Sequence, residues 1–257
     1  GKTKEEAEKN TTIYLAAQDM LRKWEAGDAA VLDLWNTMNN WVYEGFGVTY
    51  QKIGIDFEKE YKESEFYLHG KKMVQEGLTQ GAFFKKEDGS IWVDLTSDGL
   101  DQKVLLRADG TSMYITQDMG VAEARYGDFK MDTSVYVVAN EQDYHFKVLK
   151  LVLQKLGRPY GDGIYHLSYG MVDLPEGKMK SREGTVVDAD DLMSEMTEEA
   201  KAFLAASEKS AAFNETEKQV LAEQIGLSAL KYFILKVDPK KRILFNPKES
   251  IDLQGHT

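Results

Sequence analysis

The first part of the chain carries apolar side chains at the three- and four-residue spacing of amphipathic helices. One set comprises Ile13, Ala17, Met20 and Trp24, and a second comprises Leu32, Trp35, Met38 and Val42. Gly27 and Asp28 stand between the two sets. The pattern predicts two helices, ending near Phe46, that form a helical hairpin.

A third helix and two hairpins are predicted next. Apolar residues recur at helical spacing within 64–76, and Gly77 supplies a stop. Two Asp-Gly pairs then interrupt strand-like segments, one within 81–95 and one within 104–115. Because Asp-Gly is a strong signal for a two-residue turn, each segment predicts a pair of antiparallel strands.

The middle of the chain alternates between strand and helix patterns. Residues 135–139 form a short apolar run typical of a buried strand, and residues 165–172 read as another strand. Between them lies an amphipathic segment, 146–156, closed by Gly157. Strands joined through a helix of this length pair in parallel, which predicts a doubly wound sheet. Its ligand site is expected beyond the carboxyl ends of the strands.

The remainder of the chain, from Ala189 onward, is predicted to be helical. One face carries Leu192, Met196, Ala200 and Phe203, and a later helix carries Leu221, Ile225, Leu230 and Ile234. The predicted class is therefore α/β: a partial doubly wound parallel sheet with an N-terminal helical insertion, β-hairpins and a C-terminal helical segment.

Composition narrows the classes of function. The 257 residues are 42% hydrophobic and include 13 tyrosines, which is enough for a sizeable folded core. The chain has no cysteine, so it has no disulfide or thiolate chemistry, and a reducing, cytoplasmic location is expected. No apolar run approaches the roughly 20 residues that cross a bilayer, so no membrane role is expected. A net charge of −11 disfavours a general nucleic-acid coat, and any nucleic-acid contact must be local.

One short loop is rich in basic residues although the chain as a whole is acidic. Residues 177–187 read GKMKSREGTVV, with Lys178, Lys180 and Arg182 between two glycines. Such a flexible cationic segment is suited to close over a polyphosphate and to stabilise charge on a leaving group. The alternative is a solvated charged loop, which composition alone favours. The position of the loop after a predicted sheet strand favours a functional role.

Two other polar clusters follow predicted strands. Tyr114 and Asp118 lie where a strand is expected to give way to a helix starting near Asp118, and a ring beside a carboxylate suits a guanidinium. The alternative is that Asp118 only caps its helix and Tyr114 only packs. Residues 140–145 (NEQDYH) follow an apolar strand, where hydrogen bonds could read a ribose or another polar substrate. A lone histidine at the start of a helix is, however, more often structural.

Several common types of site find no support. The four histidines show no ligand spacing and there is no cysteine, so no metal site is expected. Neither a G-x-S-x-G elbow nor a G-x-x-x-x-G-K-[ST] loop is present, which leaves triad hydrolysis and P-loop chemistry unsupported.

Four stretches together resemble the class I aminoacyl-tRNA synthetases, and most closely the arginyl-tRNA synthetases of the bacterial type. They are ADGTSMYITQDMGVAEARYGDF, VYVVANEQDYHFKVL, HLSYGMVDLPEGKMKSREGTVVDADDL and IGLSALKYFIL, and the resemblance covers about residues 104–257. The resemblance implies a ligase of protein biosynthesis. It would activate arginine with ATP and Mg²⁺ to arginyl-adenylate and transfer arginine to the 3′ end of tRNA(Arg). ATP would be a substrate, and no tightly bound cofactor is expected.

The resemblance also implies roles for individual residues. Tyr114 and Asp118 match the Tyr-x-x-x-Asp pair of the family that holds the substrate guanidinium, and Gln142 matches the glutamine that completes the arginine pocket. His145 matches a histidine three places after that glutamine and is placed on the ATP side.

On the ATP side, the resemblance implies a contact between adenine and the backbone of Gly170, Met171 and Val172, at a strand end. The catalytic residues would belong to the mobile signature loop over the pyrophosphate, with Lys178 also contacting ATP. They are Lys178, Lys180, Ser181 and Arg182.

Two features depart from the family pattern. Ser181 stands where the usual Lys-Met-Ser-Lys-Ser loop has its second lysine, and the His-x-Gly-His signature is missing from these 257 residues. The chain therefore resembles a fragment that is inactive alone, from a full-length protein expected to be a monomer. Its expected parts are a helical region of a catalytic-domain insertion (1–80), the second half of a Rossmann-like catalytic domain with the signature loop (81–188), and a helical stem leading toward an absent anticodon-binding domain (189–257).

Two other functions stay open. The chain could belong to another adenylate-forming or nucleotidyl-transferring enzyme of the same class that acts on a different cationic or small acid substrate. Alternatively, it could be a non-catalytic module that binds RNA or protein through a synthetase-like surface. The net charge of −11 suits a protein partner better than RNA.

Overall fold

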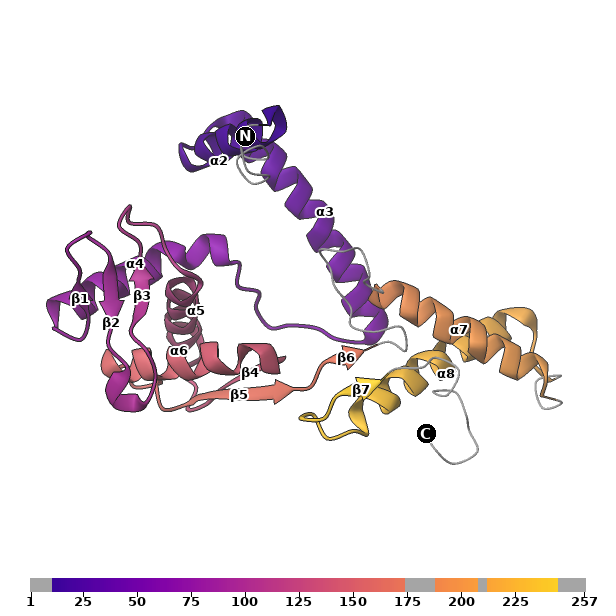
Figure 1. Cartoon of the computed structure of the whole chain (residues 1–257). Helices are drawn as coiled ribbons and strands as arrows, with labels where there is room; N and C mark the ends of the chain where they lie inside the picture. The colour runs from indigo at the N-terminus through magenta and orange to yellow at the C-terminus, as the bar shows by residue number, and fades with distance from the viewer. Residues whose placement is uncertain (1–10, 174–187, 208–211, 245–257) are drawn as a thin grey trace, which may run out of the picture. The chain divides into compact units, whose positions relative to one another are not determined.

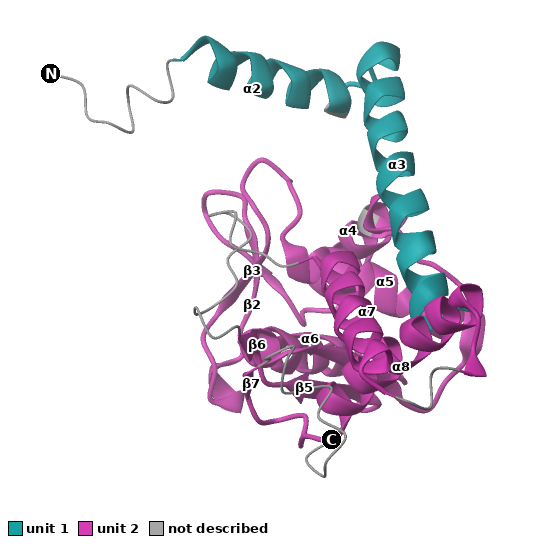
Figure 2. Ribbon diagram, turned by 90° about the vertical axis from the view of Figure 1, so that its right-hand side faces the viewer, with its two compact units in different colours: residues 1–58 teal, residues 59–257 magenta. Residues whose placement is uncertain are grey.

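The computed structural model of the chain describes residues 11–173, 188–207 and 212–244 (Figure 1). The chain divides into two compact units, residues 1–58 and 59–257 (Figure 2). The division falls inside the helical region 1–80 that was expected from the sequence. The reason is that α4 (Glu63–Thr79) packs closely against α5 (Tyr114–Phe129) and so belongs with the second unit.

The first unit consists of α2 (Thr12–Glu25) and α3 (Ala29–Ile53), and both predicted helices are confirmed. Asp28 begins α3 as its N-cap, because its side chain accepts hydrogen bonds from the next backbone N–H groups. The two helices meet at an angle near a contact between the Trp24 and Trp35 rings (Figure 2). They therefore do not lie alongside each other as the predicted hairpin requires.

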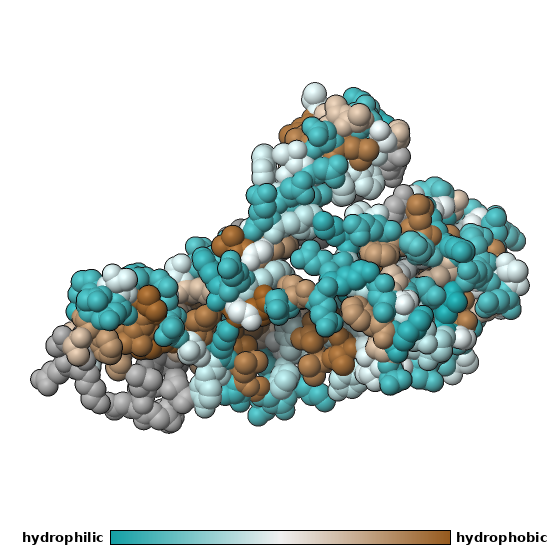
Figure 3. Space-filling model, turned by 180° about the vertical axis from the view of Figure 1, so that it is seen from behind, coloured by the Kyte–Doolittle hydropathy of each residue, from teal (hydrophilic) through white to brown (hydrophobic). Residues whose placement is uncertain are grey.

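Apolar side chains of the first unit are widely exposed. Figure 3 shows several apolar residues in brown over this unit, in the upper part of the view. No residue of α3 is buried. The exposed large apolar side chains of the unit include Ile13, Met20, Met38, Trp41 and Phe46.

The core of the second unit joins α4 and α5 to a small antiparallel sheet and to α6 (Asp143–Lys155). The sheet has the order β1-β2-β3, with strands Phe84–Lys85, Ile91–Val93 and Lys103–Leu106. The largest fully buried side chains here include Val74, Val93, Leu95, Leu105, Met119, Leu149, Val152 and Leu153. The apolar periodicity of the three helices accounts for this core.

The crossing of α4 and α5 depends on two glycines. A Cβ atom on Gly70 would lie 1.8 Å from the carbonyl oxygen of Thr116, and one on Gly120 would lie 2.4 Å from that of Phe66. Thr116 is itself fully buried, and its hydroxyl donates a hydrogen bond of 2.5 Å to the carbonyl of Leu105 in β3. The first turn of α5 is therefore held by both α4 and β3.

Gly77 does not stop the third helix, so that prediction was wrong. It lies inside α4, where a Cβ atom would come within 2.3 Å of the Phe83 ring. Close packing therefore accounts for this glycine. The helix ends at Thr79, and the chain turns at Gly81, whose φ of 75° lies in the left-handed region that glycine adopts without strain.

Both Asp-Gly turns form, but only the first joins two strands. The turn at Asp88-Gly89 connects β1 to β2 in antiparallel pairing, as predicted. After the turn at Asp109-Gly110, pairing is reduced to a bridge between Leu106 and Ser112. The prediction for 104–115 was therefore wrong in its second half, because α5 already begins at Tyr114.

The predicted strand–helix–strand unit is confirmed. β4 (Ser134–Ala139) and β5 (Ile164–Tyr169) pair in parallel along their whole length, with α6 between them in the chain. One face of the pair packs on α6, where the rings of Tyr136 and Phe146 lie 4.8 Å apart. On the other face Val135 and Val137 are 53% and 63% exposed, so the prediction of a fully buried strand was wrong. In the described residues, α6 covers one face of this pair.

The predicted strand 165–172 is interrupted at Gly170. Beyond it, the short strand β6 (Val172–Asp173) pairs in parallel with β7 (Ile243–Leu244) near the end of the described chain. The sequence pattern did not indicate β7, because a two-residue strand carries no periodicity.

The predicted C-terminal helices are confirmed as α7 (Ala189–Ala205) and α8 (Glu215–Leu235), which pack against each other. Gly226 allows this approach, since a Cβ atom there would lie 2.7 Å from the carbonyl oxygen of Met196. None of the helices in the described ranges combines the length and the apolar character that a bilayer crossing requires. The described chain is thus a mixed α/β structure, mostly helical, with small parallel and antiparallel sheets.

Candidate functional site

The candidate site lies where the beginning of α5 meets the beginning of α6. The Oδ2 atom of Asp118 and the Nε2 atom of His145 are 2.5 Å apart. Their side chains are 32% and 25% exposed, so both reach the surface from a partly shielded position. This hydrogen bond joins two of the three polar clusters that the sequence singled out.

Asp118 shares one face of α5 with Tyr114. The helix begins at Tyr114 with Met113 at the N-cap, so the strand predicted at this point is replaced by helix. Residues four apart on a helix project from the same side, one turn from each other. Tyr114 is 77% exposed, which leaves its ring open to a partner.

The structural alternatives for this pair are both wrong. Asp118 lies in the second turn of α5 and not at its N-cap, and its hydrogen bond goes to His145 rather than to a backbone N–H group. Tyr114 does not serve packing either, because most of its surface faces solvent. Both side chains are thus available for a ligand in a way that a cap or a core residue would not be.

Gln142 lies at the carboxyl end of β4, as predicted. It ends the short 3-10 helix η2 (Asn140–Gln142) and stands at the N-cap of α6, but its side chain makes no capping hydrogen bond. The residue is exposed and precedes His145 by three positions. The contact between His145 and Asp118 therefore brings the segment of Gln142 to the first turns of α5.

This arrangement has the chemistry of a site for a planar cation. A carboxylate at Asp118 offers paired, charge-assisted hydrogen bonds, and the exposed ring of Tyr114 offers a face for cation–π attraction. The amide oxygen of Gln142 is a further acceptor. A guanidinium, which is planar and carries five N–H donors, matches these groups better than an ammonium does.

An aromatic cluster supports the base of the site. The ring of Phe146 packs edge-on against His145, at 5.5 Å and 88°, and lies 4.5 Å from the ring of His166. His166 donates from Nε2 to the carbonyl of Val138 at 2.8 Å, which fixes its ring. Burial raises the pKa of Tyr136, the other ring in contact with Phe146. The ring of His145 thus rests on a partly buried, well-packed surface.

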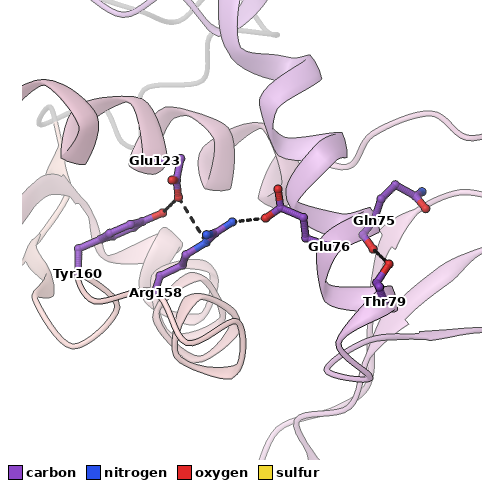
Figure 4. A network of polar contacts seen from close by, with 6 residues as sticks. All are labelled: Gln75, Glu76, Thr79, Glu123, Arg158 and Tyr160. Carbon is purple, nitrogen blue, oxygen red and sulfur yellow. Dashed lines mark hydrogen bonds and ion pairs between the residues drawn. The ribbon is translucent and has the colours of Figure 1, made fainter.

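A second polar network ties together the elements that carry the site (Figure 4). Arg158, in the loop after α6, places Nη2 2.5 Å from Glu76 in α4 and Nε 3.3 Å from Glu123 in α5. The hydroxyl of Tyr160 donates to Glu123 at 2.5 Å. Burial and the neighbouring Glu123 raise the pKa of Tyr160. The network fixes α5, which carries Asp118, against the loop that follows the helix of His145.

The residues predicted on the ATP side are less available than expected. The N–H of Gly170 donates to the carbonyl of Pro239 at 2.6 Å, and the carbonyl of Met171 accepts from Ile243 at 3.1 Å. Val172 is paired with Ile243 between β6 and β7. Two backbone groups that could read an adenine ring are therefore engaged within the protein. The other two backbone groups at this bend that an adenine ring could contact are the carbonyl of Gly170 and the N–H of Met171.

His145 was expected on the ATP side, but the structure places it against Asp118. No spacing in the sequence signals this pair, because the two residues lie on different helices. The predicted loop residues Lys178, Lys180, Ser181 and Arg182 lie outside the described residues. Within residues 11–173, 188–207 and 212–244, no group of three or more metal-binding side chains lies close enough to hold an ion.

Comparison with known proteins identifies relatives along the whole chain. The family described as "tRNA synthetases class I (R), catalytic domain" matches residues 1–246. Arginine–tRNA ligases of Porphyromonas gingivalis and Bacteroides thetaiotaomicron are each 59% identical over 257 residues, which is 100% of this chain and 43% of their own length. The chain therefore spans less than half the length of these relatives.

Solved structures show the same fold. The crystal structure of arginyl-tRNA synthetase from Plasmodium falciparum is similar with a TM-score of 0.76 and 21% identity, over 95% of this chain and 42% of that one. A structure of the Thermus thermophilus arginyl-tRNA synthetase has a TM-score of 0.66 and 19% identity, over 91% of this chain and 46% of that one. At these identities the likeness concerns the fold alone.

Proposed function

Because the chain belongs to the family of class I arginyl-tRNA synthetase catalytic domains, we propose that it supplies the arginine-binding part of an arginine–tRNA ligase. The complete protein would activate arginine with ATP and transfer it to tRNA(Arg) in the cytoplasm, acting as a monomer. The observation that carries the proposal is the contact of Asp118 with His145, which joins the helix of Tyr114 and Asp118 to the helix that Gln142 precedes.

Arginine would bind with its guanidinium at Asp118. A carboxylate has about four lone-pair positions, so a hydrogen bond from His145 to Oδ2 leaves capacity for a substrate. Tyr114, one helical turn earlier, would contact the guanidinium with its ring, and Gln142 would accept a further N–H group. These contacts select a planar cation over the ammonium of lysine, since only the former satisfies paired acceptors.

The reaction would proceed by in-line transfer at the α-phosphate of MgATP. The carboxylate oxygen of arginine attacks phosphorus, the bond to pyrophosphate breaks, and pyrophosphate leaves with Mg²⁺. The ribose hydroxyl at the 3′ end of tRNA then attacks the activated carbonyl, and AMP leaves. Lys178, Lys180 and Arg182, with Ser181, would stabilise the pyrophosphate charge, and the bend at 170–172 would meet adenine.

The fold supports separate regions for binding arginine and for binding ATP. We propose that β4, α6 and β5 belong to a doubly wound Rossmann-like sheet within 81–188, whose strand ends carry the ATP side. The helical region 1–80 would belong to an insertion of the catalytic domain, and the helices of 189–257 would form a stem toward an anticodon-binding domain.

The first test replaces the proposed guanidinium receptor. In the complete protein as its gene encodes it, Asp118→Asn should raise the KM for arginine in arginine-dependent ATP–pyrophosphate exchange with tRNA present. Loss of a charge-assisted pair in a shielded site costs on the order of 2 to 5 kcal/mol, which corresponds to at least about 30-fold.

Asp128→Asn is the matched control, because Asp128 lies on the same helix and pairs with Lys59 and Tyr61 away from the site. It should leave the KM for arginine unchanged. An Asp118→Asn variant with unaltered arginine KM and a lower melting temperature would show that Asp118 is structural. Exchange supported equally by lysine or glutamine would point to a different adenylate-forming enzyme.

A further inference from the structure

The carboxylate of the proposed arginine site already has a partner inside the protein. A carboxylate only accepts hydrogen bonds, so the short contact between Asp118 Oδ2 and His145 Nε2 requires the proton on Nε2. Tyr114 and Gln142 form no such bond to Asp118 within the described ranges. His145 is therefore the group that sets the orientation of this carboxylate before a ligand arrives.

His145 is well placed to fix a neighbour. It lies in the first turn of α6, and its ring packs edge-on against Phe146, which is buried. Asp118 is about one-third exposed, and such a side chain exchanges between rotamers unless a bond restrains it. The bond from His145 supplies that restraint from a second helix, so the direction of the carboxylate follows the packing of α5 against α6.

We propose that His145 is a positioning residue of the arginine site, which holds the carboxylate of Asp118 in the orientation that receives the substrate guanidinium. The inference rests on the proposed function, since it requires Asp118 to be the arginine receptor. It moves His145 from the ATP side, where its place in the sequence suggested a role, to the amino-acid side. His145 acts through Asp118 and touches no reacting atom.

The test uses the complete protein and two variants of His145. His145→Leu removes the donor, whereas His145→Gln keeps an amide N–H at nearly the place of Nε2. We expect His145→Leu to raise the KM for arginine about tenfold, the equivalent of one hydrogen bond to a charged group, with kcat and the KM for ATP changed little. His145→Gln should restore most of the arginine affinity.

Three outcomes would overturn the inference. A rise in the KM for ATP alone would return His145 to the ATP side, and an unchanged KM for arginine in His145→Leu would remove its positioning role. Equal loss of arginine affinity in both variants would show that His145 only stabilises the fold. Asp118→Asn distinguishes these results from failure of the premise. If that variant keeps its arginine KM, the proposed function itself fails, whereas if it loses affinity and His145→Leu does not, only this inference fails.

Discussion

Gly120 lies at a close approach of α5, which carries Asp118, to α4. A Cβ atom added there would lie 2.4 Å from the carbonyl oxygen of Phe66 and 2.8 Å from the backbone nitrogen of Gly70. Both are backbone atoms of α4 and cannot rotate away. Ordinary van der Waals contact begins near 3.4 Å, so the Gly120→Ala substitution forces α4 and α5 to separate by about 1 Å.

Two effects of opposite sign decide the outcome. Alanine is favoured over glycine inside a helix by about 1 kcal/mol. Overpacking a well-filled interface costs about 1 to 3 kcal/mol, and rigid backbone partners place this site at the upper end. The net loss of unfolding free energy is therefore about 2 kcal/mol. For a folded region of this size, that loss lowers the melting temperature by about 4 to 8 °C.

Gly127 provides the matched control on the same helix. It is exposed, and nothing lies within 4 Å of a Cβ atom built on it, so Gly127→Ala should stabilise by up to about 1 kcal/mol. Urea unfolding of both variants, followed by circular dichroism, measures the two changes with opposite expected signs. If Gly120→Ala proves as stabilising as Gly127→Ala, the two helices are not in backbone contact at this crossing.

Two ion-pair variants extend the test of the fold. Arg158→Ala leaves Glu76 and Glu123 without the cation that they share. Because the three side chains are only 23–39% exposed, we expect the free energy of unfolding, measured in urea, to fall by about 2 kcal/mol. Arg158→Lys should recover part of this loss. A hydrogen bond from Lys59 holds the pKa of Asp128 below its usual value of 3.8, so the pair stabilises the fold above that pH and is lost as pH falls below it. In Asp128→Asn, the free energy of unfolding should therefore decrease less steeply as pH falls below 3.8. An unchanged pH dependence of the unfolding free energy would contradict the pairing.

Local signals in the sequence accounted for much of the fold. Helices with clear apolar periodicity formed where predicted, and the β4-α6-β5 unit paired in parallel as expected. Gly157 closes α6 with a φ of 66°, a backbone conformation that glycine adopts without strain. These features depend on residues close together in the chain, so periodicity and turn chemistry suffice to predict them.

The start of α5 was missed because it carries no recognisable capping signal. Met113 stands at the N-cap and makes no side-chain hydrogen bond, and the next residues, Tyr114, Ile115 and Thr116, favour strands. The helix begins there because tertiary contacts override this preference. Thr116 is bonded to β3 and its backbone lies against Gly70, so the first turn of α5 is packed on both sides.

The members of the candidate site were chosen from the sequence and from the family resemblance, and their roles stay predictions; the contact that connects two of them was not foreseen. Tyr114, Asp118 and Gln142 could be selected from the sequence, whereas the pairing of Asp118 with His145 joins residues on different helices, and no spacing reveals it. The open face at Val135 and Val137 was missed for a similar reason. An apolar run predicts that a strand prefers burial, but not which element covers it.

In the proposed arginine site, the charged receptor and the neutral contacts lie on parts of the structure that are supported differently. Asp118 stands on a helix fixed by the Gly70–Gly120 crossing and is directed by His145, whereas Tyr114 and Gln142 lie exposed at the ends of elements. The energy of a charge-assisted pair depends strongly on direction, and the contact of a ring or an amide tolerates small shifts. A fixed carboxylate with adjustable neighbours therefore loses little free energy to reorganisation when a guanidinium binds, because the group that contributes most is already oriented.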